Sequence, residues 1–482
     1  ISAKEKKMRR VAWVGFSRIA LALGLIIGLE LALFSLGVAS TEPSFQELME
    51  QIAWEKNAVE RLSSPTWQPP EGWELIANNV ESVSVINSGS LGGDPATVVT
   101  AKRFEEVTGI KVNFIVVPSG ASVRRGTTIL MSRSTEADVV YVKPYIAKDW
   151  ERAGWLEPID FMYQPDPDVP RLYTNANDNV AKFEGHWYAT PWMGRYGELL
   201  YRKDLLEKYV GTSEPPRTWQ ELVDYGKKLT GNGVWGFGFY TGDIYPMGFS
   251  INFHSLMYSE GVRPEDIVDE RGIPHYDTPE AIKALEFMTK LVQEYKISPP
   301  AVTTISDTDT YEMFVAGKLA MSFQNTWVNA KLAKKWPLEK WGIAPIPVSG
   351  GWEGAPEGTV ATKVGPRHYV INPSVDPWKK AAAALFMDCF RSYEAFKNQE
   401  VVEGNQSIMP MIYEDPEVIE KVPYSDVIVE LGQHAYSTVY NNGAPVVETL
   451  MEWGNKAIMG TVSPEEALSE AQEAIEEFFP KK

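Results

Sequence analysis

The sequence predicts an α/β protein made of two units, each a mostly parallel sheet flanked by helices. Short apolar runs alternate with helical segments from residue 83 onward, and similar alternation resumes after residue 195. This β-loop-α order is typical of parallel sheets that are covered by helices on both faces. Two units of similar size, with the chain passing between them, give a cleft.

The expected elements place several loops on one rim. Ligands bind at the carboxyl ends of parallel strands, so loops 88–94, 118–122 and 143–145 should lie together. We expect strands at Val83–Ile86, Lys111–Val117 and Val139–Val142, helices at 96–107, 123–131, 218–229 and 278–295, and an alternating strand, with one face in the core, at Val234–Tyr240.

Capping residues support the helices of both units. Asp94 and Pro95 suit the N-cap and first position of a helix that ends at Gly109. Thr218 and Thr278 each suit the N-cap of a helix in the second unit.

The composition excludes several classes of protein. The 482 residues carry a formal net charge of −18, so the chain is a poor candidate for nucleic-acid binding. The single cysteine, Cys389, lies in an apolar helical run and should be a buried thiol, with no disulfide. With five scattered histidines, we expect no metal site and no cofactor. The 16 tryptophans either fill the cores or stack on sugar rings.

The N-terminal segment predicts a location outside the cytoplasm. Basic residues between Lys4 and Arg10 precede an apolar run over 19–39, which suits a signal peptide cleaved after Gly37–Val38–Ala39. The alternative is an uncleaved membrane anchor, in which Glu30 would cost roughly 2.5–3.5 kcal/mol. Both readings of residues 1–40 place the rest of the chain outside the cytoplasm. Residues 41–79, broken by Ser63–Pro65 and Pro69–Pro70, are expected to form a stalk.

A series of segments resembles one known family. From about Val83 to the C-terminus the chain resembles the family 1 extracellular solute-binding proteins of ABC importers, the maltose-binding class. The segments that carry the resemblance are Ala101–Val112, Ala137–Tyr141, Ala153–Pro158, Trp187–Pro191, Leu199–Leu206, Pro216–Leu222, Phe314–Met321, Gly342–Pro347 and Ser463–Leu468.

The resemblance implies a two-lobed periplasmic-binding-protein fold of type II character, with hinge crossings. Lobe one would hold 80–192 and 345–411, and lobe two 197–343 and 413–482. The crossings would fall near Met193–Arg195, near Ala344 and near Ile412, where Gly194 and Gly197 provide backbone freedom. Such a monomer would close on a small ligand and deliver it to a membrane permease.

By the same resemblance, Trp327 should stack on the ligand, beside Asn325. Asparagine donates and accepts hydrogen bonds, which suits sugar hydroxyls. Further candidates are Asp94, Tyr145, Trp192, Tyr196, Tyr440, Asn441 and Asn442, with Trp235 and Tyr240 ambiguous between ligand contact and core packing.

Two departures from the family pattern bear on the ligand's charge. Sugar-binding members often have acidic residues at the positions of Lys143 and Arg195. A basic cleft would favour an anionic ligand, such as an acidic sugar, whereas exposed cations or a hinge ion pair would leave a neutral oligosaccharide as the ligand. The other basic candidates are Arg124 and Arg125, which follow the Ser119–Gly120 loop, and Lys363 and Arg367.

Two other functions remain open on the sequence. A glycan hydrolase would need a pair of carboxylates, and the many acidic residues neither support nor exclude such a pair. A surface structural or adhesion protein is the third class. The sequence has no Gly-x-Ser-x-Gly elbow, Walker loop or His-Glu-x-x-His motif, so we expect a binding protein and not an enzyme.

Overall fold

The computed structural model describes residues 42–479, except 89–94, 119–120, 165, 175–176, 232, 243–246, 351–359 and 438–440. The chain divides into two compact units, Ile1–Leu48 and Met49–Lys482, and helix α2 (Phe45–Glu50) includes the boundary. The expected signal peptide or anchor lies outside the described residues. Within the described ranges, no helix has both the length and the apolar character that a membrane span needs.

Lobe one is built on a five-stranded sheet with the order β2-β1-β3-β12-β6. Strand β1 pairs in parallel with β2 and β3, and β12 runs antiparallel to β3 and β6, so only β12 opposes the common direction. The strands are β1 (Ser82–Ser88), β2 (Lys111–Val117), β3 (Val139–Val142), β6 (Ala189–Met193) and β12 (Arg367–Ile371). The flanking helices are α5 (Pro95–Thr108), α6 (Ser122–Met131), α7 (Pro144–Arg152) and α15 (Pro377–Phe390).

Lobe two is built on a four-stranded sheet with the order β10-β7-β9-β8. Strand β7 runs antiparallel to both β9 and β10, and β8 pairs in parallel with β9. The strands are β7 (Gly197–Tyr201), β8 (Trp235–Gly238), β9 (Leu319–Asn325) and β10 (Gly342–Ala344). The flanking helices are α10 (Trp219–Leu229), α11 (Met247–Ser259), α12 (Pro279–Gln293), α13 (Asp307–Val315), α19 (Gly443–Ile458) and α20 (Pro464–Glu476).

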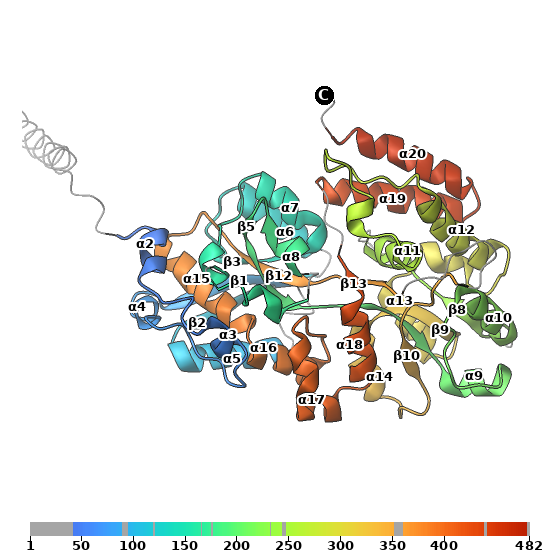
Figure 1. Cartoon of the computed structure of the whole chain (residues 1–482), viewed down its shortest axis with the longest axis horizontal. Helices are drawn as coiled ribbons and strands as arrows, with labels where there is room; N and C mark the ends of the chain where they lie inside the picture. Colours follow the sequence, from blue (N-terminus) through green and yellow to red (C-terminus); the bar gives the residue numbers. More distant parts are fainter. Residues whose placement is uncertain are drawn as a thin grey trace, which may run out of the picture. The chain divides into compact units, whose positions relative to one another are not determined.

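Shorter elements complete the described chain. They are α3 (Ala58–Leu62), α4 (Glu74–Ala77), η2 (Asp160–Met162), η3 (Pro170–Leu172), α8 (Asp178–Ala181), β4 (Lys182–Phe183), β5 (His186–Trp187), α9 (Lys203–Tyr209), η5 (Pro264–Asp266), η6 (Pro300–Thr303), η7 (Thr326–Val328), α14 (Asn329–Ala333), β11 (Thr362–Lys363), α16 (Tyr393–Asn398), η8 (Gln399–Glu403), η9 (Pro410–Glu414), α17 (Pro416–Lys421), α18 (Ser425–Gln433) and β13 (Ala435–Tyr436). Figure 1 shows α7 and α19 on one side of the connecting segments, with α17 and α18 on the other.

The local sequence signals are confirmed in both lobes. Thr218 and Thr278 cap α10 and α12 through their side chains, and Gly109 ends α5 with a positive φ of 75°. Cys389 is buried in α15. The alternating pattern expected at β8 is wrong, because three of its four residues are buried and only Trp235 is partly exposed.

Within the described residues, the chain passes between the lobes at three places. The first is 193–197, where the sequence predicted a crossing near Met193–Arg195. The chain crosses again at 364–366, between β11 and β12, and finally near β13, which pairs with β11. The expected crossing at Ala344 differs from this, because Ile346 and Ala361 pack in the core of lobe two. The expected crossing at Ile412 also differs, because η9 and α17 pack against η8 and α16 of lobe one.

The expected stalk differs from the structure from Met49 onward. Trp54, Leu62 and Trp67 are buried, and Trp67 packs against Phe104 of α5 with ring centroids 6.0 Å apart. The Trp67 indole Nε1 donates to Asp388 Oδ2 at 3.1 Å. Residues 49–79 are therefore part of lobe one, since their apolar side chains fill its core.

Candidate functional site

The carboxyl ends of the parallel strands of both sheets meet the first crossing. Strand β6 ends at Met193, and the crossing leads directly into Gly197 at the start of β7. Gly197 pairs with Asn325, the last residue of β9, and Thr326 N donates to Tyr196 O at 3.0 Å. Because ligands bind at the carboxyl ends of strands in α/β sheets, the region between these two edges is the candidate site.

Three basic residues occupy neighbouring positions on the lobe-one edge. Val142 pairs with His368, so Lys143 follows β3 opposite Arg367, the first residue of β12. Arg367 also pairs with Met193, two residues before Arg195. Arg367 Nη1 donates to Gly365 O at 2.7 Å, and Gly365 N donates to Arg195 O at 2.9 Å. Lys143 is buried, while Arg195 and Arg367 are partly exposed.

The Tyr141 hydroxyl lies within the field of two of these cations. Burial raises the pKa of Tyr141, and the positive charges of Arg367 and Arg195 pull its pKa in the opposite direction. The Tyr141 ring packs edge-on against Trp192, which in turn packs against Tyr369 with centroids 5.0 Å apart. Arg195 and Arg367 therefore lie next to an aromatic, low-dielectric part of lobe one.

Lys363 lies on the lobe-two side and is buried. Its Nζ lies 2.7 Å from Ser250 Oγ, which lies 3.1 Å from His254 Nδ1. Burial lowers the pKa of Lys363 to about 7, and burial together with the Lys363 charge lowers the pKa of His254. The chain of polar side chains continues to Tyr276, whose hydroxyl lies 2.8 Å from His254 Nε2.

Trp327 and Asn325 follow the carboxyl end of β9. Trp327 is partly exposed, and its Nε1 donates to Asp307 Oδ2 at 3.1 Å while Lys331 Nζ lies 4.3 Å from its ring centre. Asn325 Nδ2 donates to the Tyr240 hydroxyl at 2.7 Å. Asn325 and Tyr240 are buried, which leaves Trp327 as the exposed aromatic of this group.

Other predicted ligand contacts have packing or surface roles. Trp192 is completely buried between Tyr141 and Tyr369, and Tyr196 is buried with its hydroxyl donating to Ser407 O at 3.0 Å. Arg124 is exposed on α6, and Arg125 forms an ion pair with Glu136. Asp94 and Tyr440 lie outside the described residues.

Tyr145, Asn441 and Asn442 lie where the two lobes touch. Asp149 of α7 accepts backbone N–H groups from Asn442 at 2.7 Å and Gly443 at 3.1 Å, at the start of α19. Tyr145 is on the same helix as Asp149 and is buried, and Asn441 is adjacent to Asn442. Asn442 thus joins the lobes through its backbone. Sequence analysis did not identify Asp149, because an acidic residue within a helix is usually a solvated charge.

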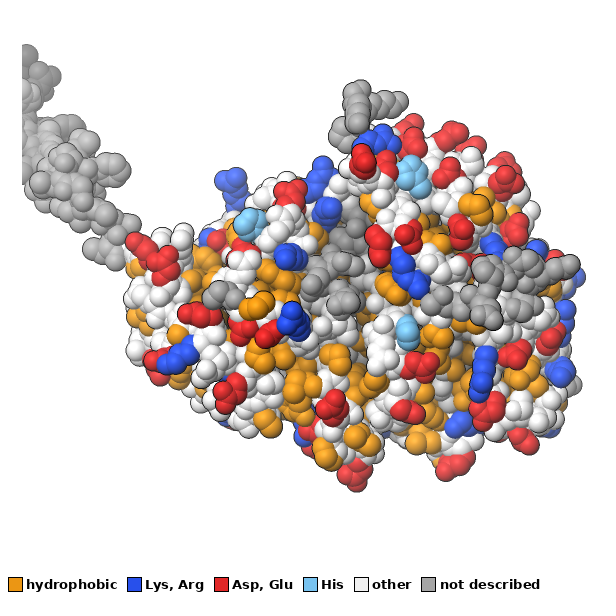
Figure 2. All heavy atoms as spheres, viewed as in Figure 1, with side chains coloured by type: hydrophobic (Ala, Val, Ile, Leu, Met, Phe, Trp, Pro, Cys, Tyr) orange, Lys and Arg blue, Asp and Glu red, His pale blue; other side chains and the backbone are white. Residues whose placement is uncertain are grey.

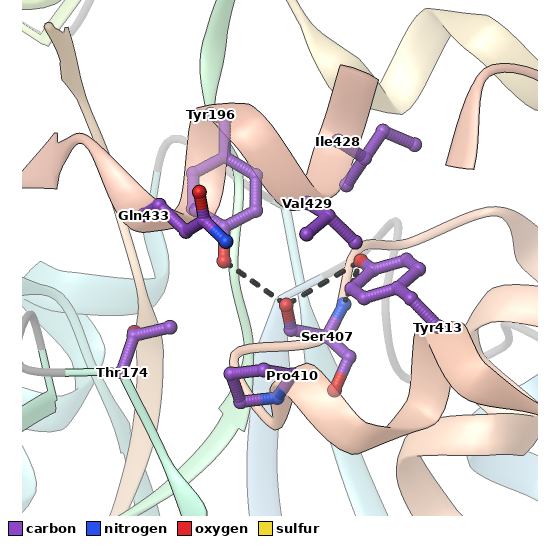
Figure 3. A pocket seen from close by; sticks show the side chains of 9 residues that line it. Thr174, Tyr196, Ser407, Pro410, Tyr413, Ile428, Val429 and Gln433 are labelled. Carbon is purple, nitrogen blue, oxygen red and sulfur yellow. Dashed lines mark hydrogen bonds between the residues drawn. The ribbon is translucent and has the colours of Figure 1, made fainter. Parts of the chain in front are cut away.

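A cavity of about 70 Å³ lies beside the crossings (Figure 3). Tyr196 and Tyr413 flank Ser407 in this view; Ser407 N donates to the Tyr413 hydroxyl at 3.1 Å. The Tyr413 hydroxyl also bonds to Glu400, and burial raises the pKa of Glu400 to about 7. A second cavity of about 160 Å³, lined in part by Asn329 and Glu400, lies between α14 and η8. Neither cavity is lined by Trp327 or Arg195.

Glu198, which the sequence analysis missed, lies next to the first crossing and should make the free energy of unfolding depend on pH. It is buried on β7, its Oε2 accepts from Asn329 Nδ2 at 3.0 Å, and burial raises its pKa to about 8. The folded protein therefore keeps a proton that the unfolded chain releases near pH 4.3, so this group's contribution to stability falls as pH rises from about 4.5 to 8. Glu198→Gln should match the wild type at pH 5 and be more stable at pH 9, by about 1 kcal/mol or more.

Denaturant titrations of both proteins at pH 5, 7 and 9 would measure this difference. Glu420→Gln, on the exposed side of α17, is the matched control for the amide substitution itself. If the difference in free energy of unfolding between Glu198→Gln and wild type stayed constant from pH 5 to 9, the raised pKa of Glu198 would be contradicted.

Solved structures with the same architecture define the fold class. Maltose-bound T. maritima MalE3 superimposes with a TM-score of 0.71 at 24% identity and covers 83% of this chain and 100% of its own. A solute-binding protein of Agrobacterium vitis with bound D-mannitol gives 0.62 at 20% identity, over 83% and 100% of the two chains. The protein therefore has the two-lobed periplasmic-binding-protein fold, which confirms the predicted fold class.

The family follows from the sequence comparison. The family model of bacterial extracellular solute-binding proteins matches residues 89–395, so the chain belongs to this family. The mannitol-binding protein of Pseudomonas aeruginosa is 26% identical over 50% of this chain and 53% of its own. The maltotriose-binding protein of Pyrococcus abyssi is 24% identical over 60% and 59%. The match thus spans little more than half the length of these relatives.

Proposed function

We propose that this chain is the extracytoplasmic binding component of an ABC-type importer, and that it captures a sugar or oligosaccharide between its lobes without altering it chemically. The observation that carries the proposal is the meeting of the two carboxyl strand edges at the first crossing, with Arg195 on one side and Trp327 on the other. Family membership and the sugars bound to the structural neighbours support it.

The protein would capture its ligand by closure of the two lobes. The described crossings, 193–197 and 364–366, are short, so a few backbone torsions there can rotate one lobe against the other. A ligand that contacts both lobes favours the closed arrangement by its difference in affinity for the two states. The closed form is then the one presented to the membrane permease. The protein would act as a monomer, and the N-terminal residues would attach it to the membrane if they are not cleaved.

A thermal-shift screen of the full chain tests this function. The panel should include maltose, maltotriose, mannitol, glucuronate, glucose 6-phosphate and a dipeptide, in a detergent without a sugar headgroup, because a maltoside could occupy the site. A sugar present at about a hundred times its dissociation constant should stabilise the protein by about 2.7 kcal/mol. It should also change the tryptophan fluorescence and be recovered intact.

Two results would overturn the proposal. Stabilisation by none of the sugars would refute sugar capture, and conversion of a radiolabelled sugar to product would show a hydrolase instead. Stabilisation by the dipeptide alone would assign another class of ligand.

A further inference from the structure

We propose that Arg367, with Lys143 and Arg195, forms an anion-binding subsite on the lobe-one edge of the candidate site, and that the ligand is a sugar or sugar acid bearing a carboxylate or phosphate. This inference rests on the proposed function and names the ligand class for that same site. It begins from the sheet register, which places three basic residues at the same end of three neighbouring strands: Lys143 just after β3, Arg195 two residues after β6, and Arg367 at the start of β12.

The strand order explains why these residues gather. Strands β3 and β6 both end at this edge, while β12, the one strand of opposite direction, begins there. Residues that follow β3 and β6 and the residue that starts β12 are therefore neighbours. Helix α7 also begins at this edge, directly after Lys143, so the positive end of its dipole points the same way.

Arg367 can recognise an anion directly. It is partly exposed, its Nη1 donates to Gly365 O at 2.7 Å, and among the described residues it has no carboxylate partner. The Gly365 bond holds the guanidinium in place while leaving other N–H groups of the fork available. A fixed guanidinium fork suits the two oxygens of a carboxylate or phosphate.

The surroundings also favour an anion. Tyr141 and His368 both lie in the positive field of Arg367, and within the described part of the chain no carboxylate contributes to the pKa shift of either group. The buried Tyr141, Trp192 and Tyr369 rings pack against one another in lobe one, so charge interactions next to them are weakly screened. By contrast, acidic and basic side chains are interspersed over the face shown in Figure 2, and the chain carries −18 overall.

A matched series of ligands tests the subsite. Mannitol, gluconate and mannitol 1-phosphate share an open six-carbon chain, and glucose, glucuronate and glucose 6-phosphate share a ring; calorimetric titration of the full chain would give the affinities. We expect at least one anion to bind about tenfold or more tightly than its neutral partner. Each series contains one carboxylate and one phosphate, so the tighter-binding anion shows which of the two groups the subsite recognises.

The variant Arg367→Gln should lose about tenfold or more in affinity for that anion and less than about threefold for the neutral partner. Arg124→Gln, which removes an exposed cation from α6, is the control and should change neither. Lys143→Gln provides a second variant if Arg367→Gln misfolds, as judged by circular dichroism.

The outcomes separate this inference from the proposed function. Neutral sugars that bind as well as or better than their anions, or equal losses for both in Arg367→Gln, would overturn the anion subsite while the binding function stands. Failure of every neutral and anionic sugar to bind would overturn both.

Discussion

Replacing Asp388 with alanine is expected to lower the free energy of unfolding by about 3–5 kcal/mol. Asp388 is completely buried, and its carboxylate lies between Arg61 and Arg391, which are 7% and 0% exposed. Arg391 Nη2 donates to Asp388 Oδ1 at 3.1 Å. Removing the carboxylate would leave two buried guanidinium groups without their anion, and such uncompensated charges are costly. Denaturant titration at pH 7 measures the loss.

A surface ion pair supplies the control. Glu71→Ala removes the partner of Lys56, but the two side chains are 69% and 59% exposed, so the loss should stay below about 1 kcal/mol. A loss below about 1 kcal/mol for Asp388→Ala as well would contradict the structural role of the buried cluster.

The effect of Asp388→Ala should also depend on pH. Burial alone would raise the pKa of Asp388, but Arg61 and Arg391 outweigh burial and hold it below its ordinary value. The carboxylate therefore stabilises the fold above the unfolded pKa near 3.9, and this contribution is lost as pH falls through the lower folded pKa. The difference between wild type and variant should shrink below about pH 4.

Gly443→Ala is expected to weaken sugar binding by about tenfold or more, with little change in the stability of the unliganded protein. A Cβ at Gly443 would lie 2.2 Å from the Tyr145 carbonyl oxygen. Tyr145 is on α7 of lobe one and Gly443 begins α19 of lobe two, so the clash opposes only the approach of the lobes. Alanine is itself a better helix former than glycine, which protects α19. Calorimetric titration with a sugar that stabilises the wild type measures the loss.

Gly432→Ala is the matched control, because its added Cβ would meet the Tyr196 hydroxyl at 3.4 Å, an ordinary contact, on the other side of the crossings. It should leave affinity within about threefold of wild type. Asp149→Asn keeps the size of the side chain and removes its charge, so it should weaken binding less than Gly443→Ala. Unchanged affinity in Gly443→Ala would show that this contact has no part in closure.

The elements that sequence analysis placed correctly have strong local signals. Strands β2 and β3 match their predicted bounds because both are continuous runs rich in valine, and the threonine caps of α10 and α12 act over three residues. The crossings at 364–366 and near β13 have no such local signal. They depend on whether side chains such as Ile346 pack with one sheet or the other, and this is decided by contacts distant in sequence.

The candidate site was predictable only at the level of the strand edge. Lys143 follows the end of β3, and Arg195 lies in the first crossing two residues after β6, because strand ends fix where the following residues go. Trp192 is buried because all five residues of β6 are buried. In such a strand, apolar and polar residues do not alternate, so the sequence does not show which side chains face the ligand and which face the core. The contact of Asp149 with α19 joins residues almost 300 positions apart, which no sequence pattern in one chain reveals.

The packing of residues 49–79 against lobe one bears on how the globular unit would move. Their buried tryptophans and the Arg61–Asp388 pair fasten this segment to lobe one. If the lobes rotate about the crossings, residues 49–79 would therefore travel with lobe one as part of the same rigid half. A fluorescent label on this segment and a second label on lobe two would then report the angle between the two halves.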